Sequence, residues 1–366
     1  MSLKAGIVGL PNVGKSTLFN AITKKDVLSA NYPFATIEPN VGVVLVPDTR
    51  LDYLKEMYNP KSFVPTSFEF TDIAGLVEGA SKGEGLGNKF LSHIREVDAI
   101  VEVVRCFSDS NIIHVAGNTD PVRDIEIINV ELILADLEIV TSRISKIEKK
   151  AIATKDKITL VELRILKICE ENLLKNYALR NIEFTKEELE VIKNFHFITL
   201  KPIIYAANVS EEDIVVGDND YTLKVKEYAD NEGAGVIVMC AKLESELSSL
   251  PLEERSDFLD SLGITNSGLD KLIFATYELL GLRTFFTSGS DEVRAWTFKN
   301  GMKAPECAGI IHSDIERGFI RAEVTKFDDL RNLGSEKKVQ ESGKLAVEGK
   351  EYLMQDGDIC YFRFNV

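Results

Sequence analysis

The sequence has no two cysteines at the C-x-x-C spacing of redox motifs and zinc ligands, because its five cysteines are scattered singly. This pattern excludes a disulfide or zinc framework and predicts free thiols in a reducing cytosol. The chain also lacks any apolar run near the roughly 20 residues that a membrane span needs. Its opening residues, Met1 to Lys4, lead directly into an apolar run, so we expect no signal peptide and no membrane partner.

Positive charge is scarce relative to negative charge. The 43 lysines and arginines are outnumbered by 58 acidic residues, which gives a net charge of −15. This balance disfavours a protein that coats nucleic acid by bulk electrostatics, so we expect no DNA partner, while a local basic face for RNA stays open. A length of 366 residues with a 45% hydrophobic share allows two or three domains with cores of their own.

Short apolar runs rich in β-branched residues recur at the spacing of an α/β sheet. Several are almost continuously hydrophobic, as expected for strands that are buried on both faces. With helical patterns between them, they predict a doubly wound, mostly parallel sheet. The runs are residues 41–46, 67–70, 99–104, 202–207 and 236–240.

The regular spacing stops between about residues 123 and 200, where the pattern becomes helical. Two apolar stripes follow each other, and the first has the alternating steps of four and three of a coiled-coil seam. With a turn at residues 153–157 between them, they predict an antiparallel helical hairpin inserted into the sheet domain. A bundle of ordinary helices within one domain is the alternative. The stripes are Ile133, Leu137, Val140, Ile144, Ile147 and Ala151, and then Val161, Ile165, Ile168 and Asn172.

From about Leu282 onwards, short strand-like runs are separated by turns that contain Asn300-Gly301 and Asp356-Gly357. Such turn residues between short β-branched and aromatic runs predict a small α+β module at the C-terminus. The runs are residues 293–298, 318–324 and 359–364.

Residues 9–17 read Gly-Leu-Pro-Asn-Val-Gly-Lys-Ser-Thr, a full match to the phosphate-binding loop (P-loop) pattern G-x-x-x-x-G-K-[ST]. An apolar run precedes the motif and a helical pattern follows it, which is the context that it needs. Its glycines let the backbone wrap phosphates, Lys15 would reach the β- and γ-phosphates, and Ser16 would place its hydroxyl on Mg²⁺. The motif predicts a protein that binds a nucleoside triphosphate through Asn12, Val13, Gly14, Lys15, Ser16 and Thr17.

Two further segments fit the same site. Phe70-Thr71-Asp72-Ile73-Ala74-Gly75 ends a strand, where Asp72 can hold the Mg²⁺ shell and Gly75 can offer its backbone N–H to the γ-phosphate. Thr36 stands where a switch-I threonine would close on Mg²⁺, and a turn-capping threonine is the other interpretation. The predicted metal ligands are therefore Ser16, Thr36 and Asp72.

The glycine-rich run from Gly75 to Gly87 resembles switch II of the TRAFAC GTPases of the Obg group. Leu76 occupies the position where Ras-like enzymes carry a glutamine that orients the attacking water. A leucine side chain cannot orient water by hydrogen bonding. The resemblance therefore implies slow intrinsic hydrolysis that draws on another group.

The base-reading segment departs from the GTPase pattern Asn-Lys-x-Asp, whose carboxylate accepts from N1–H and the N2 amino group of guanine. Here the segment is Asn208-Val209-Ser210-Glu211. A longer carboxylate without the flanking lysine does not hold guanine in the same geometry, so adenine, which lacks both donors, becomes possible. The Asn-x-x-Glu variant is similar to that of the YchF family, the Obg-like ATPases. The predicted contacts at this end are Asn208, Val209 and Glu211, with Cys240 and Ala241 in the loop that braces the base.

The resemblance to the YchF family covers essentially the whole chain. Residues 105–107, 111–115 and 120–121 look like the family's stretch after the fourth strand, and residues 292–297 with 318–323 look like its C-terminal TGS module. It implies a P-loop NTPase sheet with an inserted helical hairpin and a ubiquitin-like β-grasp (TGS) domain. The implied boundaries are 1–131 and 199–281 for the nucleotide-binding domain, 132–198 for the hairpin and 282–366 for the TGS domain.

The resemblance also supplies candidates for the missing glutamine. His114 would lie on a mobile loop and swing towards the γ-phosphate, although a histidine between Ile113 and Val115 is also typical of a satisfied structural residue. Asn12 is similar to the P-loop asparagine that binds K⁺ in some related GTPases, which makes K⁺ a candidate beside Mg²⁺. The predicted catalytic residues are Lys15, Gly75 and His114.

The leading functional hypothesis is a cytoplasmic, ribosome-binding ATPase that couples slow ATP hydrolysis to a conformational switch in translation or stress regulation. The large subunit or the whole ribosome is the partner that the resemblance implies. A GTPase of the same fold is one alternative, and a nucleotide-gated interaction protein with incidental hydrolysis is another. A protein kinase is disfavoured, because the chain has no H-R-D or D-F-G signature.

Overall fold

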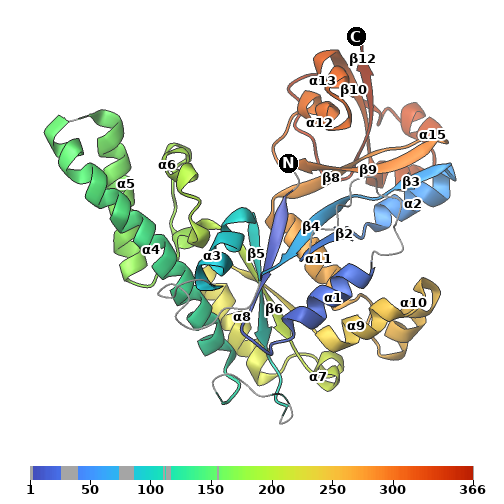
Figure 1. Cartoon of the computed structure of the whole chain (residues 1–366). Helices are drawn as coiled ribbons and strands as arrows, with labels where there is room; N and C mark the ends of the chain where they lie inside the picture. The colour runs from blue at the N-terminus through green and yellow to red at the C-terminus, as the bar shows by residue number, and fades with distance from the viewer. Residues whose placement is uncertain are drawn as a thin grey trace. The chain divides into compact units, whose positions relative to one another are not determined.

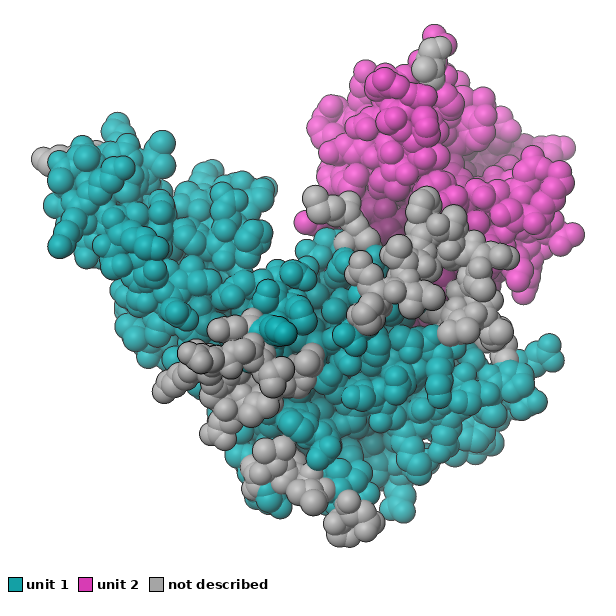
Figure 2. All heavy atoms as spheres, in the orientation of Figure 1, with its two compact units in different colours: residues 1–44, 69–272 teal, residues 45–68, 273–366 magenta. Residues whose placement is uncertain are grey.

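A computed structural model describes residues 3–25, 40–73, 86–109, 112, 117–154 and 156–365. The chain forms two compact units, which Figure 2 distinguishes by colour. The first unit comprises residues 1–44 and 69–272, and the second comprises residues 45–68 and 273–366. Each is described below by itself. Among the described residues, no helix is both long enough and apolar enough to span a membrane.

The first unit is built on a six-stranded sheet with the order β2-β4-β1-β5-β6-β7. β1 pairs in parallel with β4 and with β5, and β5, β6 and β7 continue the parallel arrangement. β5 and β6 are buried along their whole lengths, which explains their continuous hydrophobicity. The predicted parallel sheet is confirmed. Its strands are β1 Lys4–Val8, β2 Val41–Leu45, β4 Ser67–Asp72, β5 Ala99–Arg105, β6 Ile203–Asn208 and β7 Gly235–Met239.

Helices cover both faces of this sheet, as the doubly wound fold requires (Figure 1). α1 packs against α9 on one face, and α4 packs against α8 on the other. The helices are α1 Lys15–Lys25, α3 Leu86–Glu96, α4 Pro121–Thr154, α5 Lys157–Leu174, α6 Lys186–Ile192, α7 Glu211–Val216, α8 Asp220–Glu232, α9 Ala241–Ser249, α10 Leu252–Ser261 and α11 Gly268–Leu279, with the short 3₁₀ turns η2 Leu179–Asn181, η3 Lys193–Phe195 and η4 Ile198–Leu200.

The predicted helical hairpin is present as α4 and α5, which pack side by side (Figure 1). The first predicted stripe forms its core, and only Leu137 of that stripe is partly exposed. The second stripe was predicted in the wrong register, because Val161 is 42% exposed. The buried side chains of α5 are instead Leu163, Leu166, Cys169 and Leu173, together with Ile165 of the predicted stripe. α4 also begins earlier than the predicted insertion, at Pro121, whose fixed φ suits a first helical position.

A buried carboxylate joins α4 to the segment that leads into β6. Asp136 is fully buried on α4 and accepts hydrogen bonds from the backbone N–H groups of Ile198 and Thr199, at 3.0 and 2.7 Å. The Thr199 hydroxyl donates a third bond at 2.7 Å. Burial raises the pKa of Asp136, and these hydrogen bonds act in the opposite direction. The hairpin is therefore held to η4 by one acidic side chain.

The second unit contains another six-stranded sheet, with the order β11-β10-β12-β8-β9-β3. The predicted C-terminal strands and turns are confirmed, and Gly301 and Gly357 have the positive φ values of 91° and 83° that their turns require. The strands are β3 Ser62–Val64, β8 Leu282–Thr287, β9 Glu292–Lys299, β10 Phe319–Lys326, β11 Ala346–Glu348 and β12 Asp358–Phe364, and the helices are α2 Thr49–Tyr58, α12 Ala304–Ile311, α13 Ser313–Arg317, α14 Phe327–Leu333 and α15 Glu336–Glu341.

Residues 45–68 differ from the expectation, because they were predicted within the nucleotide-binding domain and belong to the second unit. β3 pairs in parallel with β9, so that Phe63 lies opposite Val293. On α2, Leu51 and Leu54 are buried in one cluster with Phe286 and Val293. These partners lie more than 200 positions further along the chain, where local patterning gives no sign of them. The three-part domain boundaries stay a prediction.

Candidate nucleotide-binding site

The P-loop connects β1 to α1 in a conformation suited to an anion. Asn12 and Gly14 have positive φ values of 64° and 98°, which bend the loop before α1 begins at Lys15. The N–H of Leu18 donates to the carbonyl of Gly14 at 2.9 Å, the first hydrogen bond of the helix. The N–H groups of the first turn have no partner inside a helix, and together with the helix dipole they favour a phosphate.

Gly14 is required by packing as well as by its backbone angle. A Cβ atom at this position would lie 2.3 Å from Nδ2 of Asn208, far inside van der Waals contact. A side chain at residue 14 would therefore push Asn208 out of its position, in addition to straining a positive φ.

Asn208 braces two loops of the site. Its side chain is buried at the end of β6, where Nδ2 donates to the carbonyl of Val13 at 2.8 Å. Its Oδ1 accepts from the N–H of Ala241 at 2.9 Å. The P-loop and the loop after β7 are thus tied to one amide. Asn208 was predicted as a base contact; in the structure both heteroatoms of its amide are engaged by the protein.

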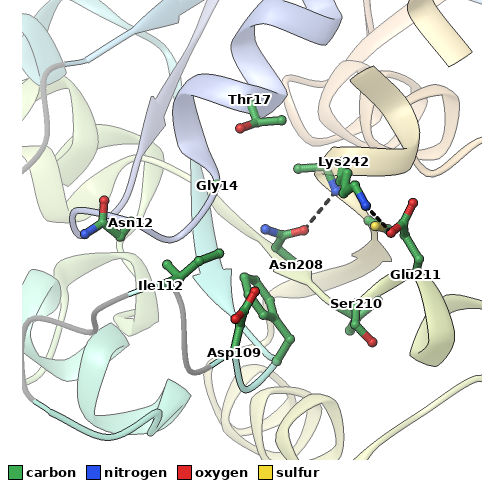
Figure 3. Close-up of a pocket in the computed structure, with 13 residues that line it drawn as sticks. Asn12, Gly14, Thr17, Asp109, Ile112, Asn208, Ser210, Glu211 and Lys242 are labelled. Carbon is green, nitrogen blue, oxygen red and sulfur yellow. Dashed lines mark hydrogen bonds and ion pairs between the residues drawn. The ribbon is translucent and has the colours of Figure 1, made fainter. Parts of the chain in front are cut away.

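A cavity of about 550 Å³ opens at the carboxyl ends of β1, β5, β6 and β7, where α/β proteins bind their ligands (Figure 3). A second hollow of about 470 Å³ lies over the P-loop, and the two share Asn12, Gly14 and Thr17. The larger cavity is lined by Asn12, Gly14, Thr17, Phe107, Asp109, Ile112, Asn208, Val209, Ser210, Glu211, Cys240, Ala241 and Lys242.

Every predicted nucleotide contact except Val13 lines one of these two hollows. Val13 is buried and contributes its carbonyl to the Asn208 brace. Lys15 and Ser16 line only the hollow over the P-loop, whereas Glu211 and Cys240 line only the larger cavity. The arrangement offers one space for phosphates and an adjoining one, within the size range of ligand pockets, for a nucleoside.

One wall of the larger cavity is held by Arg105, which sequence reasoning did not identify as part of the site. This side chain is almost fully buried, and its guanidinium donates to the carbonyls of Phe107, Asp109 and Ile112 at 3.1, 3.2 and 3.1 Å. It also lies over the Phe107 ring, 4.6 Å from the centroid. A planar group with five donors can satisfy several carbonyls at once, which a lysine could not do. In the sequence, this role of Arg105 is indicated only by the position of an arginine at the end of a buried strand.

The metal side of the site is formed by Lys15, Ser16 and Asp72. In the parallel ladder Ile7 of β1 lies opposite Asp72 of β4, which places this carboxylate next to the P-loop. The Lys15 ammonium forms an ion pair with Asp72, and the two side chains are only 10% and 19% exposed. No group of three or more acidic, histidine or cysteine side chains suited to a metal occurs in the described part of the chain. Mg²⁺ does not need such a cluster when it takes one or two protein oxygens beside phosphates and water. The oxygens of Ser16 and Asp72 therefore fit this ion.

Three predicted site residues, Thr36, Gly75 and His114, lie outside the described residues, as does Leu76. Their roles stay predictions.

All five cysteines are buried free thiols, as expected from their spacing. Burial raises the pKa of each of them, for example that of Cys169 to about 12. A buried thiol with a raised pKa is a poor nucleophile and a poor metal ligand. Cys240 in the cavity wall therefore acts as an apolar surface.

Comparisons with known proteins agree with this arrangement. The family model MMR_HSR1, described as "50S ribosome-binding GTPase", matches residues 4–161, and YchF-GTPase_C, described as "Protein of unknown function", matches residues 282–365. The chain is 60% identical to the "Ribosome-binding ATPase YchF" of Bacillus subtilis (strain 168) and 50% identical to the protein of that name from Escherichia coli O157:H7, in each case over the full length of both. A solved structure named as the Schizosaccharomyces pombe YchF GTPase superposes with a TM-score of 0.89 at 42% identity, covering 99% of this chain and 98% of that one.

Proposed function

Because the chain belongs to the YchF family, we propose that it is a ribosome-binding ATPase that hydrolyses ATP slowly to ADP and phosphate with Mg²⁺. The cavity at the strand ends carries this proposal, since it adjoins the P-loop and leads from the phosphate-binding N–H groups to the Asn208–Glu211 segment. The triphosphate would lie on the first turn of α1, and the base would lie between the loops after β5, β6 and β7.

On the phosphate side, Lys15 is proposed to supply positive charge, and Ser16 and Asp72 are proposed to hold the metal ion. Lys15 would release Asp72 and place its ammonium on the β- and γ-phosphates. Ser16 and Asp72 would hold Mg²⁺, which supplies positive charge to the phosphate oxygens when bound. Thr36 and Gly75 are proposed to close on the metal and the γ-phosphate. Loss of the γ-phosphate would release both, which is the basis of the proposed switch.

The proposed slow rate follows from Leu76, which cannot orient a water molecule. His114 is our candidate for that task, and a K⁺ ion beside Asn12 is an additional source of positive charge. A neutral imidazole can both accept a proton and orient water, and its usual pKa lies near neutral pH.

We expect His114→Ala to slow ATP hydrolysis by about tenfold or more, since a positioned proton acceptor contributes at least that much. The affinity for ATP should stay within a few-fold, because the histidine would act on the attacking water. Single-turnover phosphate release and equilibrium binding measure the two quantities. His93→Ala changes an exposed histidine of α3 and should leave both unchanged. An unaltered rate in His114→Ala would return His114 to a structural role.

The names of the relatives differ over the base, since the Bacillus subtilis protein is called an ATPase and the Schizosaccharomyces pombe structure a GTPase. The deciding experiment is equilibrium binding of ATP and GTP analogues to one preparation with Mg²⁺. Our proposal expects ATP to bind about tenfold more tightly or better, which corresponds to roughly 1.4 kcal/mol. Preference for GTP would keep the phosphate chemistry and identify a GTPase of the same fold.

Ribosome binding, a role in translation or stress regulation and a cytoplasmic location are proposed from the family, with the helical hairpin and the C-terminal unit as the parts that transmit the switch. Sedimentation with ribosomes or isolated large subunits in the presence of ATP analogue, ADP or no nucleotide tests this. Binding that changes with the nucleotide supports a switch. Equal binding in every state, also when hydrolysis is blocked, would favour an interaction protein whose hydrolysis is incidental.

A further inference from the structure

Two charged side chains meet at the edge of the larger cavity. Glu211 is the first residue of α7, three positions after Asn208, and Lys242 follows Ala241, whose N–H is bound by the same Asn208. Oε2 of Glu211 and Nζ of Lys242 are 2.5 Å apart, and both residues line the cavity (Figure 3). The backbones that carry the pair are therefore anchored by one buried amide, although 31 positions separate the two residues.

This ion pair is exposed, with 67% of the Lys242 side chain and 42% of the Glu211 side chain accessible. The Glu211 carboxylate raises the pKa of Lys242, which keeps the ammonium charged. Exposed ion pairs contribute little to folding stability, so stability does not account for this pair. Because both residues line the cavity, the pair can offer hydrogen-bond donors and acceptors to a bound ligand.

The two bases present different edges to such a pair. Guanine presents two adjacent donors, N1–H and the N2 amino group, which a free carboxylate can accept together. Adenine presents one donor, the N6 amino group, beside one acceptor, N1. A carboxylate next to an ammonium offers one acceptor and one donor, since a lysine has three N–H donors and no acceptor. The pair of one acceptor and one donor thus matches the edge of adenine. With guanine, the positively charged donor of Lys242 would face another donor.

We infer that Lys242 determines the choice of base in this protein by pairing with Glu211. Lys242 occupies the carboxylate that would otherwise accept from guanine, and its ammonium supplies the donor for N1 of adenine. The base preference expected from the sequence was assigned to the Asn208–Glu211 segment, and Lys242 was not among the predicted contacts. The inference rests on the proposed preference for ATP.

The test is equilibrium binding of non-hydrolysable ATP and GTP analogues, with Mg²⁺, to the full-length wild type and to Lys242→Met. Methionine keeps the length of the side chain and removes the donors and the charge. We expect Lys242→Met to bind the ATP analogue more weakly and the GTP analogue more tightly, so that the ratio of the two Kd values moves towards GTP by about tenfold or more. Adding Glu211→Gln to Lys242→Met should abolish the gain in affinity for GTP, because the freed carboxylate is then absent.

Matched variants separate this effect from a general change of surface charge. Lys226 forms a similar exposed pair with Asp218 at 2.6 Å and lines neither hollow, so Lys226→Met should leave both Kd values unchanged. Lys242→Arg keeps a cationic donor and should keep the preference for ATP. If the wild type prefers ATP and the ratio of the two Kd values in Lys242→Met stays within twofold of the wild-type ratio, the inference is overturned and the proposed ATPase is not. A wild type without that preference would overturn the proposed ATPase, and the inference with it.

Discussion

Lys15→Ala should reduce the rate of ATP hydrolysis by roughly 10²–10³-fold, the loss expected when a preorganised donor to developing phosphate charge is removed. The affinity for ATP should fall as well. In the structure Lys15 forms an ion pair with Asp72, so the variant also leaves that carboxylate without its partner until Mg²⁺ and ATP bind.

Single-turnover phosphate release and binding of a fluorescent ATP analogue measure the two effects of Lys15→Ala. Lys4→Ala is the matched control. Lys4 forms an ion pair with Glu69 at 3.0 Å, as Lys15 does with Asp72, but it lies at the end of β1 that is far from the P-loop. The control should bind and hydrolyse ATP like the wild type. Full retention of binding and turnover by Lys15→Ala would disprove the assignment of the P-loop.

Asp136→Ala should lower the free energy of unfolding of the first unit by about 3–5 kcal/mol, because it leaves two backbone N–H groups and a hydroxyl buried without an acceptor. Urea unfolding followed by far-ultraviolet circular dichroism measures the loss, since α4 and α5 contribute much of the helical signal. Asp136→Asn keeps one acceptor oxygen and should lose less than Asp136→Ala.

The control for the acidic substitution is Glu138→Ala, because Glu138 is exposed on the same helix two positions away. It should change the free energy of unfolding by no more than about 0.5 kcal/mol, as is usual for surface substitutions. If Asp136→Ala were as stable as Glu138→Ala, the three hydrogen bonds would not hold the hairpin to η4.

The elements that could be predicted from the sequence are those whose cause is local. The P-loop takes its form from nine consecutive residues and from the helix that follows, so its position and its glycines were foreseen. β5 and β6 could be predicted from their continuous hydrophobicity, which is typical of strands that are buried on both faces. The stripe on α4 was equally clear, because it repeats over five turns in one register.

What escaped prediction depends on partners far away in the chain. β3 joins β9 only because the second unit folds around residues 45–68, and its three residues carry no pattern of their own. The register of α5 was misplaced because the adjacent residues Ile165 and Leu166 are both apolar, and a stripe can be drawn through either of them. The role of Arg105 and the pairing of Glu211 with Lys242 follow from the fold, which brings the ends of β5, β6 and β7 together. Local sequence patterns do not predict such pairs, because the two residues are brought together only by the fold.

The brace formed by Asn208 has a consequence for the kinetics of binding. Since its amide is bound to Val13 and Ala241 of the protein itself, the P-loop and the loop after β7 are held together without a contribution from the nucleotide. A ligand that enters a preformed pocket does not have to order these loops, and so loses less conformational entropy. Association of ATP and of GTP should then occur at similar rates. The two nucleotides would be told apart by how long each remains, so that base selection is read out in the dissociation rate.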